Sequence, residues 1–99
     1  ANETMTPETQ KLLNLARQLG VTVQRTDKLD HKQAGAWRPD ENRINIANKL
    51  DPEEAVQTLA HEIGHVILDQ DTAQNCEGEH YADRIGQTIL KAYRASTEA

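Results

Sequence analysis

The spacing of apolar residues predicts a helix near the start of the chain and a strand after it. From Leu12 to Leu19, leucine and alanine recur at helical intervals. Thr6-Pro7-Glu8 precedes this run as an N-cap followed by proline in the first helical position, and Gly20 ends it. Val21-Thr22-Val23 then alternates between apolar and polar residues, which is typical of a strand.

A hairpin and two further helices are predicted in the rest of the chain. The segments AGAW (34–37) and RINIA (43–47) flank RPDEN, a sequence typical of a hairpin turn. A helix begins at Asp51-Pro52-Glu53-Glu54, which combines a cap, a proline in the first position and a capping box. Residues 69–78 are polar and predict a loop, and the pattern becomes helical again from Glu79 to about Ala95. This order predicts a small α+β domain with a short antiparallel sheet, a single domain over residues 1–99.

The helix that begins at Asp51 contains the stretch TLAHEIGHVILD, residues 58–69. With His61 placed at 0° on the helix, His65 falls at about 40° and Glu62 at about 100°, so all three share one face. Two histidines four residues apart can both bind one zinc ion, and the glutamate between them is placed to take a proton from the attacking water. The alternative is a solvated helix face that happens to carry two histidines. The apolar residues of this helix lie on the opposite face: Val56, Leu59, Ile63, Val66 and Ile67.

Two histidines leave a zinc site incomplete, so a third protein ligand must come from another segment. Glu79 is the best candidate, because it begins the next predicted helix and shares a stripe with the small residues Ala82 and Gly86, which allow a close helix contact. Asp83, one turn further on, is placed to accept a hydrogen bond from a ligating histidine. Three other residues are alternatives for the third position: Cys76, Glu77 and His80.

Gly64 lies inside the predicted helix, where glycine costs about 1 kcal/mol relative to alanine. It either tolerates a crowded contact, for example with the hairpin, or keeps a neighbouring strand or cleft beside His61 clear of a side chain. Both explanations place another backbone close to the face that carries the histidines.

Composition limits the core and the partners. A chain of 99 residues buries only about 60–65% of its unfolded surface, and with no Phe present the packing must come from Leu, Ile and Val. The 16 acidic and 11 basic residues give a net charge of -5, which argues against binding of nucleic acid or a membrane surface. A single cysteine, Cys76, and the lack of a signal-like apolar stretch favour a cytoplasmic setting.

The segment from Gly35 to Leu90 resembles the metallopeptidase domain of the ImmA/IrrE family, of the gluzincin type. The matching motifs are Gly35-Ala36-Trp37, Ile44-Asn45-Ile46, Pro52-Glu53-Glu54, the His-Glu-x-Gly-His motif of residues 61–65 and Glu79-His80-Tyr81-Ala82-Asp83. Ile85-Gly86 departs from the Phe-Ala pair usual at that point, which is a tolerable change in the core. The resemblance implies a zincin-like fold and Zn²⁺ held by His61, His65 and Glu79, in a minimal single-domain form.

These observations together lead to a hypothesis about function. The chain is expected to be a zinc metalloendopeptidase in which Glu62 is the general base. Its expected substrate is a protein or peptide, and a repressor-like protein is one candidate. The strand of residues 43–47, if it forms the edge of the sheet, would hold an extended substrate by backbone pairing. The alternative function is a non-catalytic, zinc-stabilised regulatory or protein-interaction module.

Overall fold

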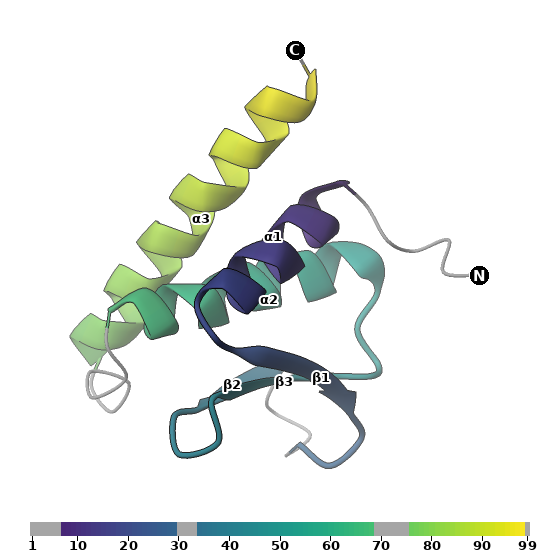
Figure 1. Cartoon of the computed structure of the whole chain (residues 1–99), viewed down its shortest axis with the longest axis vertical. Helices are drawn as coiled ribbons and strands as arrows, with labels where there is room; N and C mark the ends of the chain where they lie inside the picture. Colours follow the sequence, from purple (N-terminus) through teal and green to yellow (C-terminus); the bar gives the residue numbers. More distant parts are fainter. Residues whose placement is uncertain (1–6, 30–33, 69–75, 99) are drawn as a thin grey trace.

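A computed structural model describes residues 7–29, 34–68 and 76–98, and for residues 76–79 and 96–98 it describes the backbone alone. No helix in these ranges is both long and apolar enough to cross a membrane. The elements, in chain order, are α1 (Pro7–Gln18), β1 (Thr22–Thr26), β2 (Gly35–Arg38), β3 (Arg43–Ala47), α2 (Pro52–Ile67) and α3 (Cys76–Glu98) (Figure 1). Three helices and a three-stranded sheet confirm the predicted α+β class.

The sheet has the order β1-β3-β2, and it is mixed. β2 pairs with β3 antiparallel as the predicted hairpin, whereas β1 pairs with β3 parallel. The prediction of a wholly antiparallel sheet was therefore wrong for β1. The reason is that the chain returns through β2, so that β1 and β3 run in the same direction on adjacent positions. β3 is the central strand, and its Ile44 and Ile46 are almost fully buried.

Two of the local signals at the helix ends are confirmed, those at Asp51 and Gly20. Asp51 caps α2: the backbone N–H of Glu54 donates to its carboxylate at 2.8 Å, and the N–H of Asp51 donates to the Glu54 carboxylate at 3.1 Å. Gly20 follows α1 with a φ of 79°, in the left-handed region that favours glycine. Thr6, the predicted cap of α1, lies outside the described residues.

The third helix is longer than the sequence predicted. α3 begins at Cys76, inside the predicted loop of residues 69–78, and continues to Glu98. Gly78 lies in the first turn of α3 and does not stop the helix, because one glycine costs only about 1 kcal/mol and the long helix that follows offsets it. Residues 69–75, the rest of that predicted loop, lie outside the described residues.

α2 packs against α1, α3, β2 and β3, so it is the centre of the fold. Figure 1 shows it above the sheet, with α3 crossing it and α1 beside it. Leucine, isoleucine and valine form most of the core, as the composition predicted, and alanine residues join them. The buried cluster consists of Leu12, Ala16, Val21, Ile44, Ile46, Val56, Leu59, Ala60, Ile63 and Leu90.

The contact between α2 and α3 is unusually close at two points. A Cβ atom at Gly64 of α2 would overlap the carbonyl oxygen of Ala82, and one at Gly86 of α3 would lie 2.5 Å from the carbonyl oxygen of Ala60. The prediction that Ala82 and Gly86 allow a close approach is confirmed. The neighbour that requires glycine at position 64 is α3, and the hairpin is not the cause.

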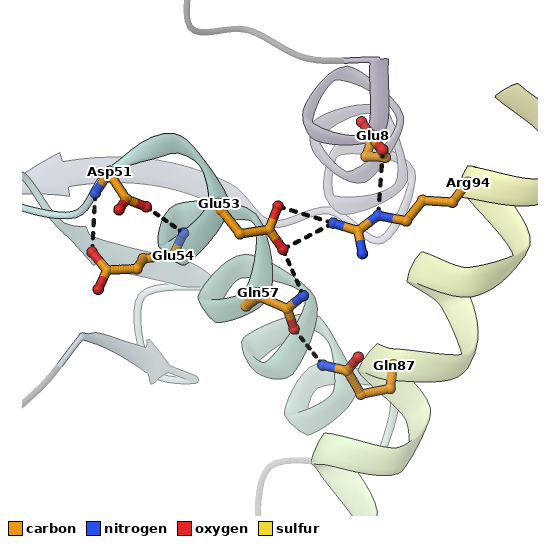
Figure 2. Close-up of polar contacts among 7 residues, drawn as sticks. All are labelled: Glu8, Asp51, Glu53, Glu54, Gln57, Gln87 and Arg94. Atoms are coloured by element: carbon orange, nitrogen blue, oxygen red, sulfur yellow. Dashed lines mark hydrogen bonds and ion pairs between the residues drawn. The ribbon is translucent and has the colours of Figure 1, made fainter. Parts of the chain in front are cut away.

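Arg94 of α3 joins the three helices through ion pairs (Figure 2). Its Nη2 donates to both carboxylate oxygens of Glu53 on α2, at 3.0 and 3.1 Å, and its Nε donates to Glu8 on α1 at 3.3 Å. The pKa of Glu53 lies below its ordinary value of 4.5, because the Gln57 side chain donates a hydrogen bond to it and Arg94 donates others. A carboxyl group with a lowered pKa stabilises the fold above its unfolded pKa, and that contribution is lost as the pH falls through the folded value.

Replacing Arg94 with Met should therefore destabilise the protein in a pH-dependent way. Urea unfolding at about pH 7 should show a loss of about 0.2–1 kcal/mol, the range for exposed ion pairs, and at about pH 3 this loss should be smaller, because the Glu53 carboxylate becomes protonated as the pH falls below its lowered pKa. Arg17→Met, an exposed arginine of α1, is the matched control and should change little. An equal loss at both pH values would contradict the prediction, because it would assign the effect to packing of the Arg94 stem.

Candidate functional site

α2 presents His61, Glu62 and His65 toward α3 and the sheet. The side chain of His61 is 24% exposed, whereas Glu62 and His65 are buried, at 7% and 3%. The two imidazole rings meet edge to face, with centroids 4.9 Å apart. The two histidines therefore lie side by side on one face of α2, as predicted.

The histidine face of α2 is largely covered, whereas one of the two interpretations of the sequence was a solvated helix face that carries two histidines. The first residue of β2 lies directly over it: a Cβ at Gly35 would be 2.6 Å from Cγ2 of Thr58 and 3.4 Å from Cγ of Glu62. α3 covers the same helix from the other side at Gly64. The reading of these residues as a solvated face is wrong for Glu62 and His65.

Asp83 of α3 lies beside His61, as the helical stripe predicted. Its Oδ1 is 3.5 Å from Nδ1 of His61. A carboxylate at Nδ1 favours the imidazole tautomer that carries its proton there, and this makes Nε2 the nitrogen able to bind a metal. The arrangement fits a metal site, since orientation of a ligating histidine by a carboxylate is the usual supporting contact.

The described side chains do not include the predicted third ligand. Glu79 lies in α3, but its side chain is outside the described residues, as are those of its rivals Cys76 and Glu77. Among the described side chains, no three His, Cys, Asp or Glu residues are grouped closely enough to hold a metal ion. His80 is among those side chains, so in this conformation it does not complete a site with the two motif histidines. Its ring is exposed and contacts Tyr81 instead, with centroids 5.7 Å apart.

A cavity of about 270 Å³ opens beside His61 and Glu62. Six of its lining residues belong to the two helices, and Ala34 and Gly35 close it from the sheet side. The lining residues are Ala34, Gly35, Gln57, Thr58, His61, Glu62, Asp83 and Gln87. Tyr81 lines a separate apolar groove on the outer side of α3 with Arg84, Ile85, Thr88 and Ile89.

Three residues that line the cavity were not predicted from the sequence: Gln57, Thr58 and Gln87. A signal for two of them existed, because Gln57 precedes His61 by one helical turn and Gln87 follows Asp83 by one turn. Thr58 lies against Gly35 of β2, and no local pattern in the sequence predicts a contact between these two residues.

The site combines two adjacent imidazoles, a buried carboxylate and an open cavity, on an α+β framework. In a comparison with sequence families, the family described as the IrrE N-terminal-like domain, a peptidase family, matches residues 5–98, and this match supports a metallopeptidase-like domain. The chain belongs to this family, so the resemblance to ImmA/IrrE proteins is confirmed.

A solved structure with the same fold is a Mycobacterium tuberculosis transcriptional regulator. The two chains are 17% identical and superpose with a TM-score of 0.63. The match covers 90% of this chain and 30% of that one, so this chain spans less than a third of the regulator's length. A comparison with curated proteins returned no significant match.

Proposed function

We propose that this domain is a zinc-dependent metallopeptidase that hydrolyses peptide bonds, with Glu62 as the general base. The observation that carries the proposal is Glu62, a buried residue that lines the cavity together with His61. A purely structural zinc site needs only its ligands and has no use for a further carboxylate beside them. Glu62 therefore favours an enzyme over the alternative, a non-catalytic zinc-stabilised interaction module.

The proposed ligands of Zn²⁺ are His61, His65 and Glu79. Support comes from the 4.9 Å separation of the two imidazole rings and from the contact of Asp83 with His61. When bound, zinc supplies Lewis acidity, which polarises the substrate carbonyl and makes water acidic enough to ionise near neutral pH.

Glu62 carries out the proton transfers in this proposal. Its carboxylate accepts a proton from the water that attacks the peptide carbonyl carbon, and it then gives that proton to the nitrogen of the leaving amine as the C–N bond breaks. The low exposure of Glu62 excludes most competing water from this carboxylate.

The open edge of β2 is the proposed support for an extended substrate, in place of the strand of residues 43–47. That earlier expectation was wrong, because β3 is paired on both sides. The N–H of Ala47 donates to the carbonyl of Ala34 at 2.8 Å, so in the alternating antiparallel pattern the backbone groups of Gly35 and Trp37 face away from β3. Because Gly35 also lines the cavity, a strand paired here would run beside Glu62.

The proposed substrate is a protein or an extended peptide. We propose a repressor-like protein in the cytoplasm as one such substrate. The general support for this is that the chain shares its fold with part of a transcriptional regulator. Direct binding of nucleic acid or a membrane is not part of the proposal, since the net charge of -5 opposes both.

Metal analysis of purified variants tests the ligand set. The wild type should contain about one zinc per chain, and His61→Ala and Glu79→Ala should each lose most of it, because removal of one of three protein ligands leaves the site incomplete. His80→Ala is the matched control and should keep its zinc. Chelation of the metal should also lower the midpoint of thermal unfolding, since a ligand that binds only the folded state stabilises it. Retention of zinc by Glu79→Ala together with its loss from His80→Ala would reverse the ligand assignment.

A further inference from the structure

The lining of the cavity includes a pair of amide side chains, those of Gln57 and Gln87. Nε2 of Gln87 on α3 donates to Oε1 of Gln57 on α2, and both residues line the cavity with His61 and Glu62. We propose that Gln87, held by Gln57, is a specificity-determining residue that selects a hydrogen-bonding, non-acidic side chain of the peptide substrate. This inference rests on the proposed peptidase function and names a class of substrate for it.

The orientation of the two amides follows from a chain of contacts that begins outside the cavity (Figure 2). The Glu53 carboxylate, paired with Arg94, can only accept hydrogen bonds. Gln57 must therefore turn its NH₂ group toward Glu53, where Nε2 donates at 2.9 Å, and its carbonyl oxygen toward Gln87. Gln87 in turn must use one N–H for this contact. Its carbonyl oxygen and its second N–H are the hydrogen-bonding groups that Gln87 can offer to a ligand.

The other walls of the cavity favour the same kind of side chain. Of the lining residues, all except Ala34 and Gly35 are polar. An apolar side chain that displaced water here would leave polar groups without hydrogen bonds. The free energy lost in this way exceeds the free energy gained from the apolar contact. An acidic side chain would meet the carboxylates of Glu62 and Asp83. Amides and hydroxyls, which both donate and accept, satisfy these walls best.

The test uses a scanning set of capped octapeptides that carry Asn or its near-isostere Leu at one position each. Cleavage is measured with the zinc-loaded wild type, and peptide affinity is measured by NMR titration of the zinc-loaded Glu62→Gln variant. At one position the wild type should favour Asn over Leu by about tenfold, in kcat/KM and in affinity. Gln87→Met, which keeps the length of the side chain, should reduce this ratio to about one in both measurements. Gln57→Met should lower the ratio in the same direction, because it removes the group that holds Gln87.

Gln18→Met, at the exposed end of α1, is the matched control and should keep the wild-type ratio. The inference is overturned if the ratio survives in Gln87→Met, or if the wild type shows no preference for Asn at any position. Failure of the proposed function has a different signature. If peptides bind with a ratio that depends on Gln87 but none is cleaved, the subsite stands and the peptidase activity does not. If no peptide binds, both fail.

Discussion

Replacing Glu62 with Gln should lower the rate of peptide hydrolysis by at least about a hundredfold while the zinc content stays unchanged. The amide has the volume of the carboxylate and leaves both histidines in place. It cannot accept a proton from the attacking water at neutral pH, so the step that depends on Glu62 fails. Because Glu62 as a residue is only 7% exposed, bulk buffer is a poor substitute for it.

The measurement combines steady-state cleavage of extended peptides and unfolded proteins with metal analysis of the same samples. Glu41→Gln, in the turn between β2 and β3, removes an exposed carboxylate outside the cavity and should keep wild-type activity. Turnover by Glu62→Gln within about threefold of the wild type would remove Glu62 from the mechanism, since a positioned acid-base group contributes at least about a hundredfold. Loss of zinc from the variant would instead give Glu62 a structural part in the site.

The second large effect is expected for Gly64→Ala. The added Cβ would overlap the carbonyl oxygen of Ala82 and lie 2.8 Å from its carbonyl carbon, so the backbones of α2 and α3 must separate. Alanine gains about 1 kcal/mol of helix propensity, but overpacking usually costs about 1–3 kcal/mol, and for an overlap with rigid backbone we expect about 3–4 kcal/mol. We expect a net loss of about 2–3 kcal/mol, which lowers the unfolding midpoint of a domain of this size by about 10–20 °C.

Thermal and urea unfolding measure this loss, with Thr88→Ala on the exposed side of α3 as the control, expected within about 0.5 kcal/mol of the wild type. Ala82→Gly should not rescue Gly64→Ala, because the clash is with the Ala82 backbone and not with its side chain. The same separation should weaken zinc binding, because Asp83 moves away from His61 with α3. A Gly64→Ala protein as stable as the wild type would show that the helices can part without cost.

The sequence by itself determined the features that depend only on residues close together in the chain. The Asp51 cap with Glu54, the glycine that ends α1 and the hairpin of β2 and β3 depend on neighbouring residues, and they are present as predicted. The helical period likewise placed His61 and His65 together, since residues four apart on a helix share a face in any context. Family membership followed from the same short motifs.

The tertiary structure decided everything that depends on which segments meet across space. The parallel pairing of β1, the burial of Glu62 under Gly35 and the bridge from Gln57 to Gln87 each join residues that are far apart in the chain. A local pattern records that a face is apolar or polar, but it does not record which element covers that face. Glycine at position 64 illustrates the difference: its cost in a helix is readable from the sequence, whereas the reason for it, the backbone of Ala82, exists only once α3 has packed against α2.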